Sequence, residues 1–222
     1  MGTKISFPRP DGKQATGYLA KTAQANAPGV VVIQEWWGLQ DQIKGICDRL
    51  ALAGYEALAP DLFAGTVVPY HDSAAAGREM KSLNFLDATD QVVRGAIQYL
   101  GKTGVKVGLT GFCMGGAVAI LGAIRIPEVA AAVTFYGLPP EGAFKPADIK
   151  VPLQGHYANI DDYITPQKVD ALEAGLKVAK CKYEMFRYDA DHGFMNEQRD
   201  VHERAAAELG WKRMLGFWKK YL

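Results

Sequence analysis

The stretch VGLTGFCMGGAVAI, residues 107–120, sets a cysteine between two glycines where a strand pattern gives way to a helical one. A Gly-x-Cys-x-Gly turn between strand and helix projects its nucleophile above the sheet, because the glycines remove side chains that would collide there. The pattern predicts a nucleophilic Cys113 at a helix N-terminus, with the N–H of Met114 facing the oxyanion that forms. The alternative is a structural cysteine beside packing glycines.

The rest of the chain alternates between strand and helix patterns. Strands are expected at residues 29–34, 55–60, 105–111, 129–137, 151–157 and 182–188, and helices at 40–54, 87–100, 116–124, 166–179 and 201–221. Residues 64–82 are expected to form a loop with irregular helix, and residues 138–149 a Pro-rich loop. This alternation predicts an α/β fold with a mainly parallel central sheet and helices on both faces. No linker divides the chain, so residues 1–222 are expected to form a single domain.

The composition of the chain argues against several kinds of binding partner. The chain has 25 basic and 24 acidic residues without a basic stripe, so no nucleic-acid partner is expected. No apolar run approaches the roughly 18 to 20 residues that span a bilayer, so no membrane association is expected. The three cysteines, Cys47, Cys113 and Cys181, have neither disulfide nor metal-ligand spacing. We expect a cytoplasmic monomer with no metal and no organic cofactor, in which Cys47 and Cys181 are core residues.

A cysteine nucleophile needs a base and an acid that orients the base. In hydrolases with this topology the chain order is nucleophile, acid, base. His192 follows a late strand and precedes Gly193, which suits the base. Asp161 is the preferred acid and Asp162 the second choice. Asp189 and Asp191 are disfavoured because they lie too close to His192 along the chain to face its ring well.

The other three histidines have structural interpretations. His156 is expected to cap or orient the loop after its strand. His202 is expected to be a solvated residue of the final helix, and His71, in the irregular loop, has no evident partner.

Five segments together resemble the dienelactone hydrolase (carboxymethylenebutenolidase) family of the α/β-hydrolase superfamily. They are VVVIQEWWGL (30–39), YEALAPDLF (55–63), GFCMGG (111–116), HYANIDDYITP (156–166) and DADHGFMN (189–196). Their order and spacing match the family over nearly the whole chain, which implies the α/β-hydrolase fold and hydrolysis of a small-molecule lactone or ester.

The resemblance also implies site roles. It implies a catalytic triad of Cys113, His192 and Asp161. A glutamate after the first core strand takes the thiol proton when substrate binds, and Glu35 matches that position. The backbone N–H of Trp36 would be the second oxyanion donor beside that of Met114.

Substrate-binding positions depart from the family pattern. Members that act on carboxylate-bearing dienelactones hold that carboxylate with arginines. One such position is occupied here by Asn196, and Arg78 corresponds loosely to the other. Phe194 and Trp36 are candidates for an apolar pocket.

Three hypotheses for function follow. The leading one is hydrolysis of an enol lactone or similar activated ester through a thioester. The second is a general carboxylesterase or thioesterase without lactone preference. The third is a non-catalytic or redox-sensing protein with the same fold, in which Cys113 is oxidised reversibly.

Overall fold

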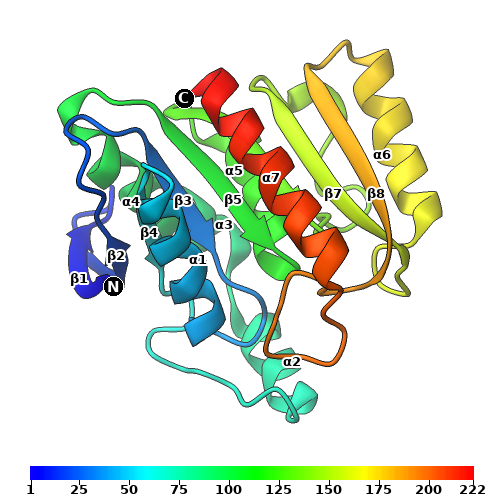
Figure 1. Ribbon diagram of the computed structural model, residues 1–222, viewed down its shortest axis with the longest axis horizontal. Helices are drawn as coiled ribbons and strands as arrows, with labels where there is room; N and C mark the ends of the chain where they lie inside the picture. The colour runs from blue at the N-terminus through cyan, green and yellow to red at the C-terminus, as the bar shows by residue number, and fades with distance from the viewer.

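One eight-stranded sheet runs through the computed structural model, which describes all residues from 1 to 222 (Figure 1). Its strands lie in the order β1-β2-β4-β3-β5-β6-β7-β8. Their bounds are β1 (Thr3–Pro8), β2 (Gln14–Ala20), β3 (Gly29–Ile33), β4 (Glu56–Pro60), β5 (Val107–Phe112), β6 (Val129–Phe135), β7 (Leu153–Ile160) and β8 (Tyr183–Asp191). The six strands from β4 to β8 in this order pair in parallel, which confirms the predicted mainly parallel α/β sheet.

The N-terminal part of the sheet was not predicted. β1 and β2 form an antiparallel hairpin, and β2 pairs antiparallel with β4. The strands β1 and β2 lie at the edge, with exposed and buried residues mixed, and carry no continuous apolar run. A parallel strand buried on both faces produces such a run, and an edge strand does not.

The chain has seven α-helices, most of which lie against the sheet, whereas α2 lies below it in the view of Figure 1. They are α1 (Asp41–Leu52), α2 (Ser73–Ser82), α3 (Phe85–Asp87), α4 (Arg94–Leu100), α5 (Met114–Arg125), α6 (Pro166–Val178) and α7 (Arg204–Tyr221). α1 and α7 pack on one face, and α4, α5 and α6 pack on the other. None of these helices combines the length and apolar character that a membrane crossing requires.

Successive side chains of β3 point to opposite faces of the sheet and so contribute to the hydrophobic core on both sides. Val30 and Val32 point into the layer beneath α1 and α7, whereas Val31 and Ile33 point into the layer beneath α4 and α5. Successive side chains of a strand face opposite sides of the sheet, so a run of β-branched residues fills both layers at once. The wholly buried β3 and β5 thereby form a rigid base for the residues at their carboxyl ends.

Several helix boundaries differ from the expected ones. The helix expected over 87–100 is divided into α3, a π-helical segment at Ala88–Val93, and α4. The hydroxyl of Thr89 donates to the carbonyl of Phe85 at 2.7 Å, a side-chain contact that competes with regular helix bonding. The segment 64–82 contains a regular helix, α2, whose N-cap is the carboxylate of Asp72.

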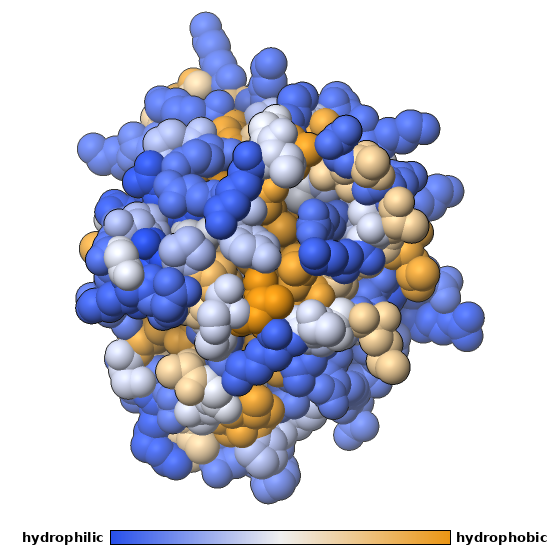
Figure 2. Space-filling view, turned by 90° about the vertical axis from the view of Figure 1, so that its left-hand side faces the viewer, coloured by the Kyte–Doolittle hydropathy of each residue, from blue (hydrophilic) through white to orange (hydrophobic).

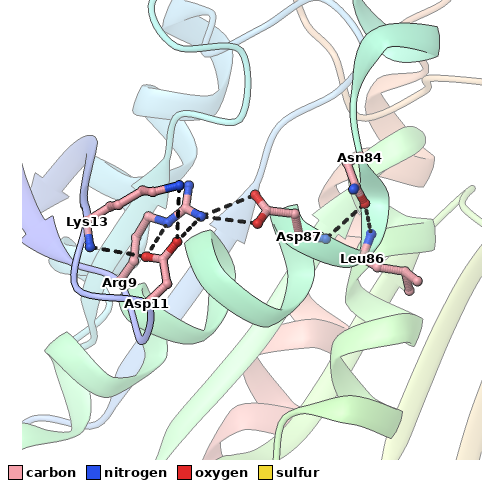
Figure 3. Close-up of polar contacts among 6 residues, drawn as sticks. All are labelled: Arg9, Asp11, Lys13, Asn84, Leu86 and Asp87. Atoms are coloured by element: carbon pink, nitrogen blue, oxygen red, sulfur yellow. Dashed lines mark hydrogen bonds and ion pairs between the residues drawn. The ribbon is translucent and has the colours of Figure 1, made fainter.

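The β1–β2 turn is fastened to the start of α3 (Figure 3). Arg9 donates to Asp11 at 2.7 Å and to Asp87 at 3.2 Å, and Asn84 caps α3 through the N–H groups of Leu86 and Asp87. Figure 2 shows this side of the molecule, where hydrophilic side chains surround a smaller group of hydrophobic ones. A polar hollow of about 400 Å³ lies here beside Lys4, Arg9 and Asp61, apart from the cysteine turn.

Candidate active site

Cys113 lies on a strained turn between β5 and α5. Its backbone has φ 53° and ψ −117°, a conformation that a non-glycine residue adopts only when its surroundings impose it. A side chain at Gly111 would meet the carbonyl oxygen of Gly115 at 1.9 Å, and one at Gly115 would meet that of Ile33 at 2.5 Å. The N–H of Cys113 donates to Phe135 on the neighbouring strand at 3.0 Å. Only glycines fit around this turn, which leaves the thiol half-buried at the carboxyl edge of the sheet.

Three side chains from separate loops meet at this edge. His192 Nε2 lies 3.1 Å from Cys113 Sγ, and its Nδ1 lies 2.7 Å from Asp161 Oδ2. Cys113 follows β5, Asp161 follows β7 and His192 follows β8, so the parallel strands deliver the three groups to one place. The structure thus brings together the residues that the sequence singled out as nucleophile, acid and base.

Among the candidate acids, only Asp161 has a buried side chain; Asp162, Asp189 and Asp191 are exposed. The Asp161 side chain is 0% exposed, and its Oδ1 accepts the N–H groups of Tyr163 and Ile164 at 2.8 Å each. Asp162 is exposed. Asp191 is also exposed, and Asp189 instead accepts a hydrogen bond from the side chain of Asn159. Thr165 occupies the N-cap of α6, so neither Asp161 nor Asp162 caps that helix.

The His192–Asp161 contact changes the protonation of both groups. Burial by itself lowers the pKa of His192, but its hydrogen bonds to Asp161 and Cys113 raise that pKa to about 10. Burial by itself raises the pKa of Asp161, but the hydrogen bond to His192 and the two backbone N–H groups lower it below its usual value. Each partner favours the charged form of the other, so an ionised Asp161 faces a protonated imidazole at neutral pH.

The backbone N–H groups of Met114 and Trp36 have no hydrogen-bond acceptor within the protein. Met114 is the first residue of α5, where an N–H has no intrahelical acceptor. Trp36 lies in the turn after β3, and its N–H donates to no group of the protein.

Glu35 occupies a closed polar site beside the triad. It is 3% exposed, and its carboxylate accepts hydrogen bonds from Tyr136 Oη at 3.0 Å and from Asn196 Nδ2 at 2.8 Å. It makes no hydrogen bond with Cys113, whose Sγ contacts His192 instead. Burial raises the pKa of Glu35, although the hydrogen bonds from Asn196 and Tyr136 oppose that effect. The net direction is upward, because burial disfavours the ionised carboxylate more than the two hydrogen bonds favour it, so the pKa of Glu35 lies above its usual value.

Tyr136 and Tyr70 received no polar role from the sequence. Tyr136 is fully buried, has a φ of 39°, and packs its ring 5.1 Å from that of His192 while binding Glu35. The hydroxyl of Tyr70 lies 3.3 Å from Asn196 Nδ2. The position of Tyr136 directly after β6, at the same edge as Cys113, was the signal that could have found it.

Of the four substrate-binding candidates, Phe194 and Asn196 are buried, Arg78 is exposed, and Trp36 is half-buried with its ring 5.0 Å from that of Trp37. Phe194 is 0% exposed and packs against Tyr136 and Tyr188, so it belongs to the core. Asn196 is likewise 0% exposed and holds Glu35, which occupies its amide. Arg78 lies on α2 with its side chain exposed and without an ion pair.

The predictions for His156 and His202 are wrong. His156 caps no loop: it is wholly buried on β7, between Tyr188 Oη at 2.7 Å and Gln154 Oε1 at 2.8 Å. His202 lies before the final helix, which begins at Arg204, and its half-buried ring contacts the carbonyl of Phe194 at 2.8 Å. A loop that folds back over Phe194 explains why His202 is not solvated.

The remaining histidine, His71, and the remaining cysteines, Cys47 and Cys181, differ in burial. His71 is exposed. Cys47 is fully buried, and Cys181 is half-buried with its thiol 3.3 Å from the carbonyl of Pro146. No group of three or more His, Cys, Asp and Glu side chains is arranged to hold a metal ion.

A mainly parallel sheet, a Gly-x-Cys-x-Gly turn after β5 and a loop after the last strand whose histidine contacts that cysteine are the features of an α/β hydrolase. The chain belongs to the dienelactone hydrolase family, whose model matches residues 15–222. It is therefore a hydrolase that acts on carboxylic esters or lactones.

Individual relatives match over their whole length. "Protein usf" of Aquifex pyrophilus is 34% identical, with 100% of each chain covered. A protein of Aquifex aeolicus named "Putative carboxymethylenebutenolidase" is 33% identical, again with 100% of each covered. The crystal structure named "Putative Dienelactone Hydrolase" from Klebsiella pneumoniae superposes with a TM-score of 0.88 at 28% identity, covering 100% of both chains.

Proposed function

We propose that this protein hydrolyses an enol lactone or a similarly activated ester through a thioester on Cys113. His192 is the base and acid of the reaction, and Asp161 orients its ring. The N–H groups of Met114 and Trp36 hold the oxyanion. The observation that carries the proposal is the continuous line of contacts from Asp161 through His192 to the sulfur, at 2.7 and 3.1 Å.

The reaction proceeds in two halves. The thiolate of Cys113 forms a bond to the substrate carbonyl carbon, and the carbon–oxygen bond to the leaving group breaks. The leaving oxygen takes the proton from His192 Nε2, which leaves a neutral imidazole beside the thioester. His192 then removes a proton from water, the resulting hydroxide attacks the thioester, and the acid product and the thiolate are released.

Glu35 is the second candidate, after His192, for the group that accepts the thiol proton of Cys113. In the conformation described above, Cys113 Sγ contacts His192, so His192 is the group that takes the thiol proton. For Glu35 to do so, as the family resemblance implies, its carboxylate leaves Tyr136 and Asn196 and turns toward the sulfur. Its burial supports this role, because a desolvated carboxylate is a stronger base than an exposed one.

Trapping the acyl-enzyme tests the proposal. Rapid mixing with p-nitrophenyl acetate should release a burst of p-nitrophenol equal to the enzyme concentration, and mass spectrometry should locate an acetyl group on Cys113. Cys113→Ala should abolish both signals, and Cys47→Ala, which alters a buried thiol on α1 that makes no hydrogen bond with His192, should leave both. A full burst in Cys113→Ala would refute the proposed nucleophile.

A general carboxylesterase without lactone preference is the second candidate. It is favoured by Asn196, whose buried amide stands where a carboxylate-binding arginine would be expected and is occupied by Glu35. Comparing kcat/KM for a cis-dienelactone and for p-nitrophenyl acetate separates the two. A large preference for the acetate would favour the esterase, and failure to hydrolyse any ester or lactone would favour a non-catalytic, redox-sensing role.

A further inference from the structure

Two exposed apolar side chains flank the acid of the triad. Ile160 and Tyr163 lie on either side of Asp161 in the sequence, and each is 64% exposed. The other large apolar side chains beside the triad, Tyr136 and Phe194, are fully buried. An isolated exposed apolar residue needs no explanation, but a pair bracketing a buried triad acid points to a function at that place.

Hydrogen bonds hold the backbone of Tyr163, and its side chain is exposed to solvent. Its N–H donates to Asp161 Oδ1 at 2.8 Å, and its carbonyl accepts from Lys168 Nζ at 2.8 Å. Its ring centroid lies 5.1 Å from that of His192 at an interplanar angle of 57°. The ring is therefore held next to the imidazole, and no other aromatic side chain packs on it.

Two tyrosines of opposite exposure pack on the His192 ring. Tyr136 packs 5.1 Å from it on the buried side and is 0% exposed. Tyr163 packs 5.1 Å from it and is open to solvent. A molecule that approaches His192 from solvent can contact Tyr163 without displacing core side chains, whereas Tyr136 is closed off.

The chemistry places one part of the substrate at this position. When the thioester forms, the carbon–oxygen bond of the ester breaks, and the departing oxygen takes the proton from His192 Nε2. A group that receives this proton must lie within hydrogen-bonding distance of Nε2, roughly 2.6 to 3.2 Å. The carbon skeleton attached to that oxygen then lies beside the imidazole, the ring on which the exposed Tyr163 packs.

We propose that Tyr163 forms a leaving-group subsite that favours esters and lactones whose departing oxygen is attached to a flat, unsaturated group, such as an aryl ring or an enol. The inference rests on the function proposed above. Tyr163 is a specificity-determining residue in this reaction, and it contacts the leaving group rather than the acyl group.

Esters that share one acyl group test this assignment. Phenyl acetate and trifluoroethyl acetate give the same acetyl-enzyme but release an aryl and an alkyl alcohol. An aromatic contact contributes about 0.5 to 1.5 kcal/mol, so Tyr163→Ala should lower kcat/KM for phenyl acetate about 2- to 12-fold more than for trifluoroethyl acetate. The rate of hydrolysis of the acetyl-enzyme should be the same in both proteins, because the leaving group has already departed.

Two further variants separate the subsite from a general disturbance of the site. Tyr163→Phe keeps the ring and should restore the preference for the aryl ester, whereas Tyr163→Leu keeps only apolar volume and should restore less of it. Val178→Ala, which removes an 84% exposed apolar side chain at the end of α6, should leave the ratio of the two substrates unchanged.

The outcomes distinguish this inference from the proposed function. If the unaltered protein forms the acetyl-enzyme and Tyr163→Ala slows both esters equally or neither, the leaving-group subsite is wrong and the proposed function stands. If the unaltered protein forms no acetyl-enzyme from either ester and opens no lactone, both are wrong.

Discussion

The half-buried His192 and the wholly buried His156 differ in the partners that contact their rings. The pKa of His192 is raised to about 10, whereas that of His156 is lowered to about 3. Burial lowers both values. His192 escapes this effect because it contacts an ionised carboxylate and a thiol, whereas His156 contacts the neutral side chains of Gln154 and Tyr188.

The difference shows how one sheet builds a reactive and an inert imidazole. His156 lies within β7, stacked at 4.3 Å on Phe135, where neighbouring strands supply only uncharged partners. His192 lies in the loop after β8, where the ends of other strands supply Asp161 and Cys113. A charged imidazole is stable only where an opposite charge compensates for lost hydration, so reactive groups concentrate at the carboxyl edge of the sheet.

Removing the carboxylate that distinguishes His192 should have the largest effect. Asp161→Asn should lower the pKa of His192 from about 10 toward its ordinary value of 6.5, because burial is then opposed only by the contact with Cys113. With the ring no longer oriented, kcat/KM should fall by roughly two to four orders of magnitude. NMR titration of the histidine ring protons and ester kinetics measure the two changes.

The neighbouring carboxylate offers a matched control. Asp162→Asn removes an exposed charge one residue away, and both the His192 titration and the rate should be unchanged. Equal losses in the two variants would show that general electrostatics, rather than the contact with His192 Nδ1, supports the reaction.

Sequence patterns predicted the neighbours of His192 well, and those of His156 poorly. Cys113, Asp161 and His192 each follow a strand of the parallel sheet, so strand order alone predicts that they meet. The sequence ranked Asp161 first and Asp162 second, and the burial of the Asp161 side chain, which separates the two, is visible only in the structure.

The sequence predicted which side chains are buried less well than it predicted which residues follow the strands. Phe194 and Asn196 lie directly after His192 in the sequence, which suggested contact with substrate, but the loop turns inward and buries both. The same inward turn removed His202 from the final helix. Chain proximity indicates that residues are near a site, whereas the direction of each side chain depends on how the loop packs.

Deleting the inert imidazole should affect stability rather than rate. His156→Leu leaves the hydroxyl of Tyr188 and the amide oxygen of Gln154 without their partner in a buried site. Loss of these contacts should reduce the free energy of unfolding by roughly 2 to 4 kcal/mol, as measured in urea at neutral pH. His71→Leu, at an exposed histidine, should change it by less than about 0.5 kcal/mol. If His156→Leu instead abolished acyl-enzyme formation, the division between the two histidines would be wrong.

Acid should reveal the opposite signs of the two histidines. The unfolded chain binds a proton at His156 near pH 6.5, whereas the folded protein resists it until about pH 3, so the folded state loses stability as pH falls through this window. The expected loss is about 1 kcal/mol between pH 6.5 and about pH 5.5. His192 acts in the other direction: its raised pKa stabilises the folded state fully below pH 6.5, and this contribution disappears as pH rises toward 10.

The difference between two proteins isolates this effect from other titrating groups. Unfolding of the unaltered protein and of His156→Leu, each measured at both pH values, should show the extra loss only where His156 is present. Equal pH dependence in both would mean that the His156 ring is already protonated, or already solvated, in the folded state.

The smallest effect is expected from the charge nearest to His156. The guanidinium of Arg213 lies 4.1 Å from the ring centroid of Phe186 and 5.4 Å from that of Tyr188, and its positive charge adds to burial in lowering the pKa of His156. Arg213→Gln removes the cation and should reduce the free energy of unfolding by about 0.5 to 1 kcal/mol at neutral pH. It should also weaken the acid sensitivity assigned to His156, because one of the two causes of the lowered pKa is gone. Ester turnover should be unchanged, since Arg213 contacts no residue of the triad; a slower reaction in this variant would couple the two histidines that the structure keeps apart.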